Sequence, residues 1–396
     1  MSTDHISGFV PAKGTSSRVP NKNLQILRGV PLFLWAAANL ASLIPKSRIF
    51  VHSESRLILE IARRFGYQGL ERPEPLCTNT TTGDELMTWE ASQVKSKIVI
   101  QHLPPMPFLT RTTLEAITLP VRTEQAMSAL GVFEEQSYLW GENGPLYPTD
   151  RLPNSVDLPL VTHEGMGIYV ANREWLLSGR KRVHASSHKV NLDYFERIDI
   201  DYPQQFEIAK FIAEGLPKQS KYVPASLEDP KETYRSFQRP KVMFFDIDGV
   251  QTDGGVFVGP SGVSRRFNAQ DGQGIKEALA LGIEIAFITA AANGDSIAMR
   301  AKMLGVETVL LSNQFEKFDR CSEFLDKKGV GWEECWYVGD DTPDIYPMLA
   351  SAVSIAPKNA TLMAQKVADV VSAKQGGHGF IREVCDMVST ANYDEQ

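Results

Sequence analysis

The sequence predicts an α/β protein with two Rossmann-like domains, each a three-layer arrangement of a mostly parallel sheet between helices. Its length of 396 residues exceeds what one hydrophobic core usually supports. Short apolar runs alternate with segments of helical spacing in both halves of the chain. Between the halves, residues 215–240 are rich in Lys, Pro, Ser, Glu and Tyr and lack periodicity, which is typical of a linker. We therefore expect domains at 1–214 and 241–396.

The expected elements follow one another in a regular order in each domain. In the first, we expect strands at 6–10, 48–51 and 98–101 and helices at 31–43, 57–65 and 85–94. In the second, we expect strands at 242–245, 283–288 and 336–338 and a helix at 274–280. Ligands of such sheets bind beyond the carboxyl ends of the strands, so functional residues are sought in the loops there.

Composition excludes several classes of function. With 43% hydrophobic and 22% charged residues, the chain is typical of a globular protein and not of a disordered one. A net charge of −7 offers no positive field for nucleic acid or an anionic membrane. No apolar run approaches the roughly 18 residues of a membrane span, the start lacks a signal-peptide pattern, and the four cysteines are widely scattered. We expect a cytoplasmic protein without nucleic-acid or membrane partners.

Acidic residues follow the first predicted strand of the second domain, in D-I-D-G-V-Q-T-D-G. Because alternate residues of a strand share a face, Asp246 and Asp248 could reach one site, one as nucleophile and the other as proton donor. Thr289 and Lys317 follow later in the chain and could bind phosphoryl oxygens. The segment G-D-D-T-P-D then supplies Asp340, which with Asp246 and a backbone carbonyl could hold Mg²⁺.

These four motifs resemble those of the haloacid dehalogenase-type phosphatases. The wording D-G-V-Q-T-D-G with D-G-Q-G-I is similar to the 3-deoxy-octulosonate-8-phosphate phosphatase branch, over residues 241–388. The resemblance implies that Asp246 forms an aspartyl phosphate and that Asp248 acts as general acid and then base. It also implies a magnesium site, in which Asp344 orients the metal shell and the acidic residues are Asp246, Asp248, Asp340 and Asp344.

The stretch between Gly255 and Gly282 is too short for a cap domain, which in this branch implies a homotetramer whose subunits control access to the site. The tail G-G-H-G-F-I-R-E resembles the segment that reaches a neighbour's site, where Arg382 would contact the substrate carboxylate. His378 stands where the branch usually has a basic residue. The substrate-binding residues implied for this domain are Gly272, Gly274, His378 and Arg382.

In the first domain, the loop P-A-K-G-T-S-S-R-V-P-N-K-N follows the first strand and carries Lys13, Arg18 and Lys22. Small residues and cations suit a triphosphate. Downstream, R-I-D-I-D-Y-P-Q-Q-F-E-I-A places Asp199 and Asp201 two residues apart in a strand-like segment, so both could hold Mg²⁺. A basic loop with a magnesium pair is suited to nucleotidyl transfer.

This pair of motifs resembles the acylneuraminate cytidylyltransferases, over residues 9–213. Their pattern runs I-P-A-R-G-G-S-K-x-x-P-x-K-N and later I-D-I-D-x-P-x-D-F-E-I-A. The resemblance implies CTP and a nonulosonic acid as substrates, a catalytic Lys13, and sugar-acid binding by Gln101 and Tyr169. The nucleotide-binding residues that it implies are Ala12, Lys13, Gly14, Ser16, Arg18, Lys22, Asn23, Arg72 and Thr80.

Two departures from this family concern its site. Lys13 stands where the family has arginine, so a point charge replaces a bidentate fork. The segment Q-H-L-P-P-M-P stands for Q-L-Q-P-T-S-P, and Leu103, Pro105 and Met106 remove hydrogen-bonding side chains beside the sugar. Either a different nonulosonate fits this pocket or the transferase activity has weakened.

The sequence therefore predicts a bifunctional enzyme: a phosphatase that releases a keto-sugar acid and a transferase that couples such an acid to CMP. Two alternatives remain open. In one, only the phosphatase acts and the first domain is a degenerate nucleotide-binding or scaffold module. In the other, only the transferase acts and the second domain builds the tetramer. The complete set of acids in the second domain argues against the latter, because an assembly module has no need of them.

Overall fold

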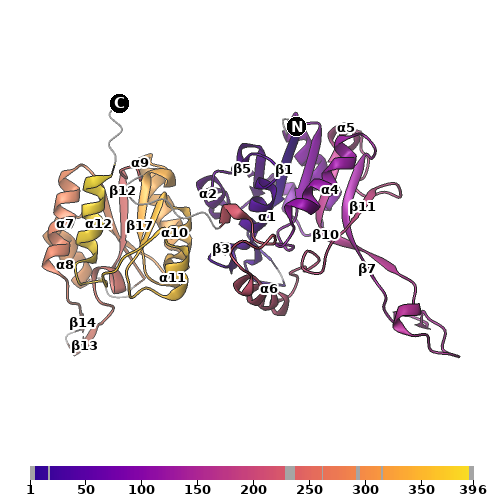
Figure 1. Cartoon of the computed structure of the whole chain (residues 1–396). Helices are drawn as coiled ribbons and strands as arrows, with labels where there is room; N and C mark the ends of the chain where they lie inside the picture. Colours follow the sequence, from indigo (N-terminus) through magenta and orange to yellow (C-terminus); the bar gives the residue numbers. More distant parts are fainter. Residues whose placement is uncertain are drawn as a thin grey trace. The chain divides into compact units, whose positions relative to one another are not determined.

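The computed structural model describes residues 5–16, 18–227, 237–260, 262–290, 295–313 and 315–391. The chain divides into two compact units, Met1–Asp229 and Pro230–Gln396. Each unit holds a predominantly parallel sheet covered by helices (Figure 1), so the predicted α/β class is confirmed. Leu216, Tyr222 and Val223 pack into the core of the first unit. The domain limits at 214 and 241 stay predictions. None of the helices within these ranges has the length and hydropathy needed to cross a bilayer.

The first unit has a seven-stranded sheet in the order β11-β7-β10-β6-β1-β4-β5. Its strands are β1 (Ile6–Pro11), β4 (Ile49–Ser53), β5 (Gln68–Glu71), β6 (Ile98–His102), β7 (Ser128–Glu135), β10 (Val161–Asn172) and β11 (His188–Asn191). β10 runs antiparallel to β6 and β7, whereas β1 is parallel to both of its neighbours. β7 and β10 extend as a ribbon beyond the body of the unit (Figure 1).

All but the last of the helices of this unit connect these strands. The helices are α1 (Leu32–Ala41), α2 (Arg56–Arg64), α3 (Gly83–Gln93), α4 (Arg111–Arg122), α5 (Arg173–Leu177) and α6 (Pro203–Gly215). Short two-stranded ribbons are formed by β2 (Ile26–Leu27) with β3 (Val30–Pro31) and by β8 (Trp140–Gly141) with β9 (Gly144–Pro145). α3 begins at a capping box, in which Thr82 and Glu85 bond reciprocally to each other's backbone amides. Every element predicted for this domain by its apolar pattern is confirmed.

Ligand-binding loops of the first unit are placed by strand order. From β1 the chain runs to β4 and β5 on one side and then returns to β6 on the other, so the loops after β1 and β6 flank the switch point. The basic loop follows β1, and Gln101 lies near the end of β6. The strand predicted at Asp199 and Asp201 is wrong. That segment forms no strand among the described residues, because the amide of Ile200 donates instead to the carbonyl of Pro105, at 3.0 Å.

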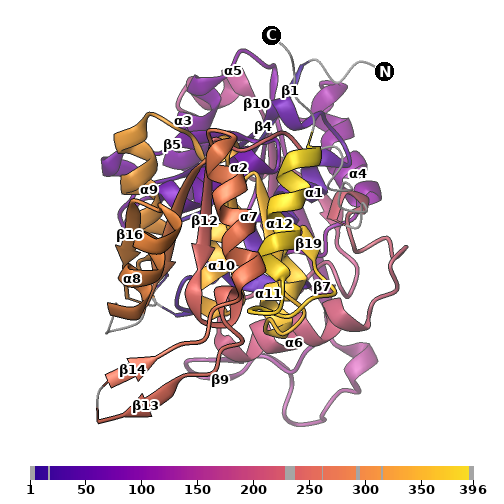
Figure 2. The same cartoon turned by 90° about the vertical axis from the view of Figure 1, so that its left-hand side faces the viewer.

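The second unit has a six-stranded parallel sheet in the order β16-β15-β12-β17-β18-β19. Its strands are β12 (Val242–Asp246), β15 (Glu284–Thr289), β16 (Thr308–Leu311), β17 (Cys335–Val338), β18 (Val353–Ala356) and β19 (Val370–Val371). Its helices are α7 (Ala269–Ala280), α8 (Asp295–Leu304), α9 (Lys317–Lys328), α10 (Ile345–Ala350), α11 (Leu362–Val367) and α12 (Phe380–Thr390). α7 and α12 lie side by side, and a hairpin of β13 (Phe257–Gly259) and β14 (Gly262–Ser264) projects from this unit (Figure 2).

Strand order again sets the position of the site in the second unit. β12 is followed by β15 and β16 on one side and by β17 on the other, so the loops after β12 and β17 meet at the switch point. The idea that Asp246 and Asp248 share a strand face is wrong. β12 ends at Asp246, and Ile247–Gln251 forms a single turn in which Gly249 has a φ of 93°.

A fully buried histidine lies at the end of β6. The His102 ring donates from Nδ1 to the carbonyl of Gly167 at 3.0 Å, and its Nε2 accepts from the side-chain amide of Asn39 at 3.2 Å. Both contacts fit the neutral ring, since a protonated ring would have no acceptor for Nδ2 of Asn39 to meet. Burial lowers the pKa of His102 to about 4.

We predict that the first unit loses stability as the pH falls from about 6.5 to about 4. Over this window His102 is protonated in the unfolded chain but stays neutral in the folded unit. This difference lowers the free energy of unfolding by up to about 3 kcal/mol. Urea unfolding followed by amide exchange in β1 and β6 measures this loss. The His102→Gln variant should reduce this pH dependence, and the exposed His188→Gln control should leave it unchanged. An unchanged slope in His102→Gln would contradict this assignment.

Candidate active sites

Three carboxylates meet at the switch point of the second unit. Asp246 ends β12, and Asp340 and Asp344 lie in the segment after β17. One oxygen atom from each lies within 4.8 Å of the others. Asp246 and Asp344 are buried, and Asp340 is half-buried. The structure thus brings together three of the acids that the sequence assigned to a metal site.

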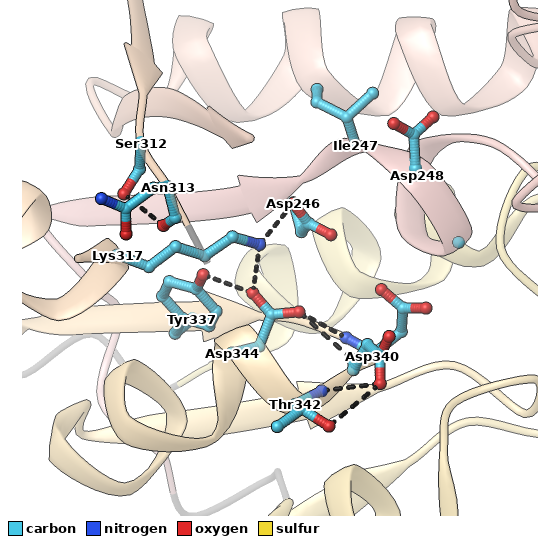
Figure 3. Close-up of polar contacts among 12 residues, drawn as sticks. Asp246, Ile247, Asp248, Ser312, Asn313, Lys317, Tyr337, Asp340, Thr342 and Asp344 are labelled. Carbon is cyan, nitrogen blue, oxygen red and sulfur yellow. Dashed lines mark hydrogen bonds and ion pairs between the residues drawn. The ribbon is translucent and has the colours of Figure 1, made fainter. Parts of the chain in front are cut away.

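Lys317 holds two of these carboxylates in place. Its Nζ lies 2.7 Å from Oδ1 of Asp246 and 2.7 Å from Oδ1 of Asp344 (Figure 3). Burial alone would lower the pKa of Lys317, but the two carboxylates outweigh it and raise the pKa above its usual value. Tyr337 donates to the same oxygen of Asp344 at 2.6 Å. The other Asp344 oxygen accepts from the amides of Asp340 and Asp341, so Asp344 orients the loop after β17.

Of the three carboxylates, that of Asp340 is the one to which Lys317 does not bond. Its Oδ1 is buried and has no hydrogen-bond partner among the described residues. Burial raises its pKa to about 8, and the carboxylates of Asp246 and Asp344 add to the shift. Burial and Asp344 likewise raise the pKa of Asp246 to about 7, against the pull of Lys317. A Cβ at Gly249 would lie 2.0 Å from Asp340 Oδ2, so only glycine permits this approach.

Asp248 lies beyond Ile247, apart from the carboxylates that surround Lys317 (Figure 3). Its two oxygens accept from Arg265, with Nε at 2.7 Å and Nη2 at 2.9 Å. Arg265 is almost completely buried and also donates to Ser296 Oγ at 3.2 Å. Asp248 is therefore placed by a bidentate guanidinium and does not join the three-carboxylate cluster.

The other residues predicted for the site of this unit make different contacts. Thr289 ends β15 and is buried. His378 faces Arg266, with Nε2 3.2 Å from Nη2. Arg382 pairs with Glu277 and Asp386 on the surface of α7 and α12. Gly272 and Gly274 lie on α7, where each allows close packing, against Arg300 and against α12 respectively. Their substrate-binding roles stay predictions.

The basic loop of the first unit is tied to neighbouring strands. The amide of Ala12 donates to the carbonyl of His52 at 3.0 Å, and Nδ2 of Asn23 donates to the carbonyl of Lys13 at 2.8 Å. Lys13 Nζ donates to Asn79, and the amide of Gly14 donates to Glu54 at 2.9 Å. A carboxylate thus already occupies a donor of the predicted phosphate loop. Ser16 is half-buried, and Thr80 is exposed.

Two loop cations reach one of the predicted metal-binding aspartates. Arg18 Nη1 lies 2.9 Å from Asp201 Oδ2, and Lys22 Nζ lies 3.3 Å from Oδ1. Lys22 also donates to the carbonyl of Ile200 at 2.8 Å. Burial, and the neighbouring Asp201, raise the pKa of Asp199 above its usual value. The structure therefore brings the two distant motifs of this domain together.

A buried polar network connects the predicted nucleotide and sugar sides of this site. Arg72 donates from Nε to His52 Nδ1 at 3.0 Å, and His52 Nε2 lies 2.7 Å from Glu90 Oε1. Glu90 accepts from Gln101 Nε2 at 2.9 and 3.0 Å. Burial lowers the pKa of His52 although Glu90 opposes this, so the ring donates to Glu90 as a neutral group. Tyr169 lies on β10, opposite Gln101 of β6, and its hydroxyl donates to Glu164 at 2.5 Å.

Sequence reasoning missed four residues of these sites: Glu90, Arg182, Arg265 and Tyr337. Glu90 gave one signal, since it is an acid on the face of α3 that also carries the buried Met87 and Ala91. Arg265 and Tyr337 gave no such signal, because nothing in the sequence around them shows that they bond to Asp248 and Asp344.

Known proteins resemble parts of this chain and, in one case, almost all of it. A family model described as cytidylyltransferase matches residues 8–139. This chain is 36% identical to the 3-deoxy-D-manno-octulosonate 8-phosphate phosphatase KdsC of Escherichia coli over 152 residues, which are 38% of this chain and 80% of that protein. The N-acylneuraminate cytidylyltransferase of Oncorhynchus mykiss is 24% identical over 97% of this chain and 88% of its own length.

Solved structures are similar to part of the chain. The 3-deoxy-D-manno-octulosonate 8-phosphate phosphatase of Moraxella catarrhalis, solved in complex with magnesium, phosphate and KDO, has a TM-score of 0.38 and 28% identity and covers 40% of this chain and 91% of that one. The first unit carries a cytidylyltransferase domain, and the chain belongs to the family of the 3-deoxy-D-manno-octulosonate 8-phosphate phosphatases.

Proposed function

We propose that this chain is a bifunctional enzyme of nonulosonic acid metabolism. Its second domain hydrolyses a sugar-acid phosphate, and its first domain transfers CMP from CTP to the free keto-sugar acid, so the two steps are consecutive. The observation that carries the phosphatase half is Asp246, a buried carboxylate at the end of β12 held by Lys317 and flanked by Asp340. The match to a sialic acid-type transferase along almost the whole chain supports the pairing of the two activities.

The carboxylate cluster of the second domain fits Mg²⁺. Three acids balanced by one lysine leave an excess of negative charge, and Oδ1 of Asp340 lacks a hydrogen-bond partner among the described residues. Hard oxygen ligands are those that Mg²⁺ prefers. Asp246 and Asp340 would hold the ion, with Asp344 orienting the loop. Bound there, Mg²⁺ supplies positive charge between the nucleophile and the phosphoryl oxygens.

The chain's own residues then divide the phosphatase chemistry. The Asp246 carboxylate attacks phosphorus, and the bond between phosphorus and the sugar oxygen breaks. Asp248 donates a proton to that oxygen and later takes one from the water that hydrolyses the aspartyl phosphate. Arg265 bonds to both oxygens of Asp248, so one of these bonds must open before that oxygen meets the leaving group. Lys317 and Thr289 bind phosphoryl oxygens.

In the first domain, the anomeric hydroxyl of the acid attacks the α-phosphorus of CTP, and pyrophosphate leaves. Arg18 and Lys22, now paired with Asp201, would turn to the triphosphate when it binds and free Asp199 and Asp201 for Mg²⁺. Lys13 and Arg72 would add charge on the nucleotide side, and Gln101 and Tyr169 would face the sugar acid.

We predict that Asp246→Asn lowers phosphate release from sugar-acid phosphates by at least about 10³-fold, because the amide is no nucleophile. Pyrophosphate release from CTP and a free keto-sugar acid should stay unchanged in the same preparation. The exposed Asp319→Asn in α9 serves as the matched control and should keep both activities. Loss of both activities in Asp246→Asn would contradict two independent sites.

Binding of Mg²⁺ to the second domain is measured separately by calorimetry. Asp340→Asn should weaken it by at least about tenfold, because one anionic ligand is lost. Its neighbour Asp341 instead caps the following turn by accepting from the amide of Thr342, a role that asparagine can fill. Asp341→Asn should therefore keep the affinity, and equal affinities of the two variants would refute the site.

We predict that Asp201→Ala lowers pyrophosphate release by at least about 10²-fold, because one of the two carboxylates that would hold Mg²⁺ is lost. Phosphate release from sugar-acid phosphates should not change. The exposed Glu207→Gln on α6 is the control for loss of an acid in this region. Full transferase activity in Asp201→Ala would overturn the role of this aspartate.

A further inference from the structure

An arginine outside all of the sequence motifs lies between the two residues expected to bind the sugar acid. Arg182 donates from Nη1 to Oε1 of Gln101, and its Cζ lies 3.7 Å from the ring centroid of Tyr169. It stands in the segment between α5 and β11 and is half-buried. The guanidinium therefore lies at the sugar-acid side of the transferase site and not on an open surface.

Several contacts fix this position. Nε2 of Gln101 is taken by Glu90, so the carbonyl oxygen of the same amide must face Arg182. The backbone amide of Arg182 donates to Asp84 at 2.9 Å. Gly83, the first residue of α3, has no side chain where the guanidinium lies, and a Cβ there would come within 2.3 Å of its Cζ. The side chain is thus held in a slot that a single methyl group would close.

Charges around Arg182 leave it without an anionic partner. Glu90 is balanced by Arg72 through His52, and Asp84 pairs with Lys181 at 3.4 Å. No carboxylate of the described residues lies within ion-pairing distance of the Arg182 guanidinium. A half-buried guanidinium of this kind can bind a carboxylate through two parallel hydrogen bonds, since Gln101 uses only one of its donors.

We propose that Arg182 binds the carboxylate of the sugar acid and makes the transferase selective for anionic sugars. The proposal rests on the transferase function and deepens it. The phenol of Tyr169 lies within electrostatic range of both Arg182 and Asp199, so an acid held by Arg182 would lie on the side of the site that faces the magnesium aspartates. Arg182 acts on the substrate itself, whereas Glu90 and Gly83 act on Arg182 as positioning residues.

The experiment uses the full chain with N-acetylneuraminate and its deaminated analogue, each also as the methyl ester, which lacks the charge. Arg182→Gln should raise the KM for the acid by about 10- to 100-fold, leave the KM for CTP unchanged and remove the preference for acid over ester. Arg182→Lys should keep part of that preference. Gly83→Ala keeps the charge and favours the helix, yet should behave like Arg182→Gln because its methyl group displaces the guanidinium.

Arg180→Gln is the matched control, because Arg180 lies over the ring of Trp175 at 4.7 Å and not at the site. An Arg182→Gln enzyme that still prefers the acid over the ester overturns the proposal while leaving the transferase function intact. If the wild-type chain releases no pyrophosphate with any keto-sugar acid, the transferase function fails instead. Calorimetry with N-acetylneuraminate and CMP then judges Arg182 alone: tighter binding to wild type than to Arg182→Gln supports it, and equal or absent binding overturns it.

Discussion

The crowding of carboxylates at the carboxyl ends of β12 and β17 is the constraint on which the second domain depends. Asp246 and Asp344 are buried within reach of each other, and like charges so placed repel unless a cation lies between them. Lys317 provides that cation at the first residue of α9 and bonds to both. The start of α9, the loop after β17 and the end of β12 are therefore fixed by one ammonium group. Removing it would leave two buried anions facing each other, which costs far more than the pair contributes.

The first domain balances its charges differently. Its cations and anions come from segments far apart in the chain, with Arg18 and Lys22 on the loop after β1 and Asp201 just before α6. These ionic contacts are partly exposed, so each contributes little to stability and can be exchanged for a ligand at small cost. The hydrogen-bonded network from Arg72 to Gln101 is buried instead, so breaking it would cost more. The site thus combines partly exposed ion pairs with a buried hydrogen-bond network.

Much of this could be predicted from local patterns. Apolar runs located three strands of each sheet, β1, β4 and β6 in one and β12, β15 and β17 in the other. Acids after two of these runs located Asp246 and Asp340, because a parallel sheet gathers its carboxyl ends at one edge. The errors arose where the backbone turned. Asp248 left the strand face because Gly249 turns the chain immediately after β12, and the segment of Asp199 and Asp201 is held by Pro105 instead of by a strand. Arg182 and Arg265 could not be found, since no spacing in the sequence records which distant groups they meet.

Each unit also buries its own set of apolar side chains, around Phe245 and Trp336 in one and around Phe9 and Trp35 in the other. A chain with separate cores falls outside the two-state description, so a single melting temperature is not a property of this protein. Calorimetric traces must be resolved into component transitions before any substitution is ranked by its thermal effect. A substitution that shifts only one transition then identifies the unit that it destabilises, and the transition of the other unit serves as an internal reference.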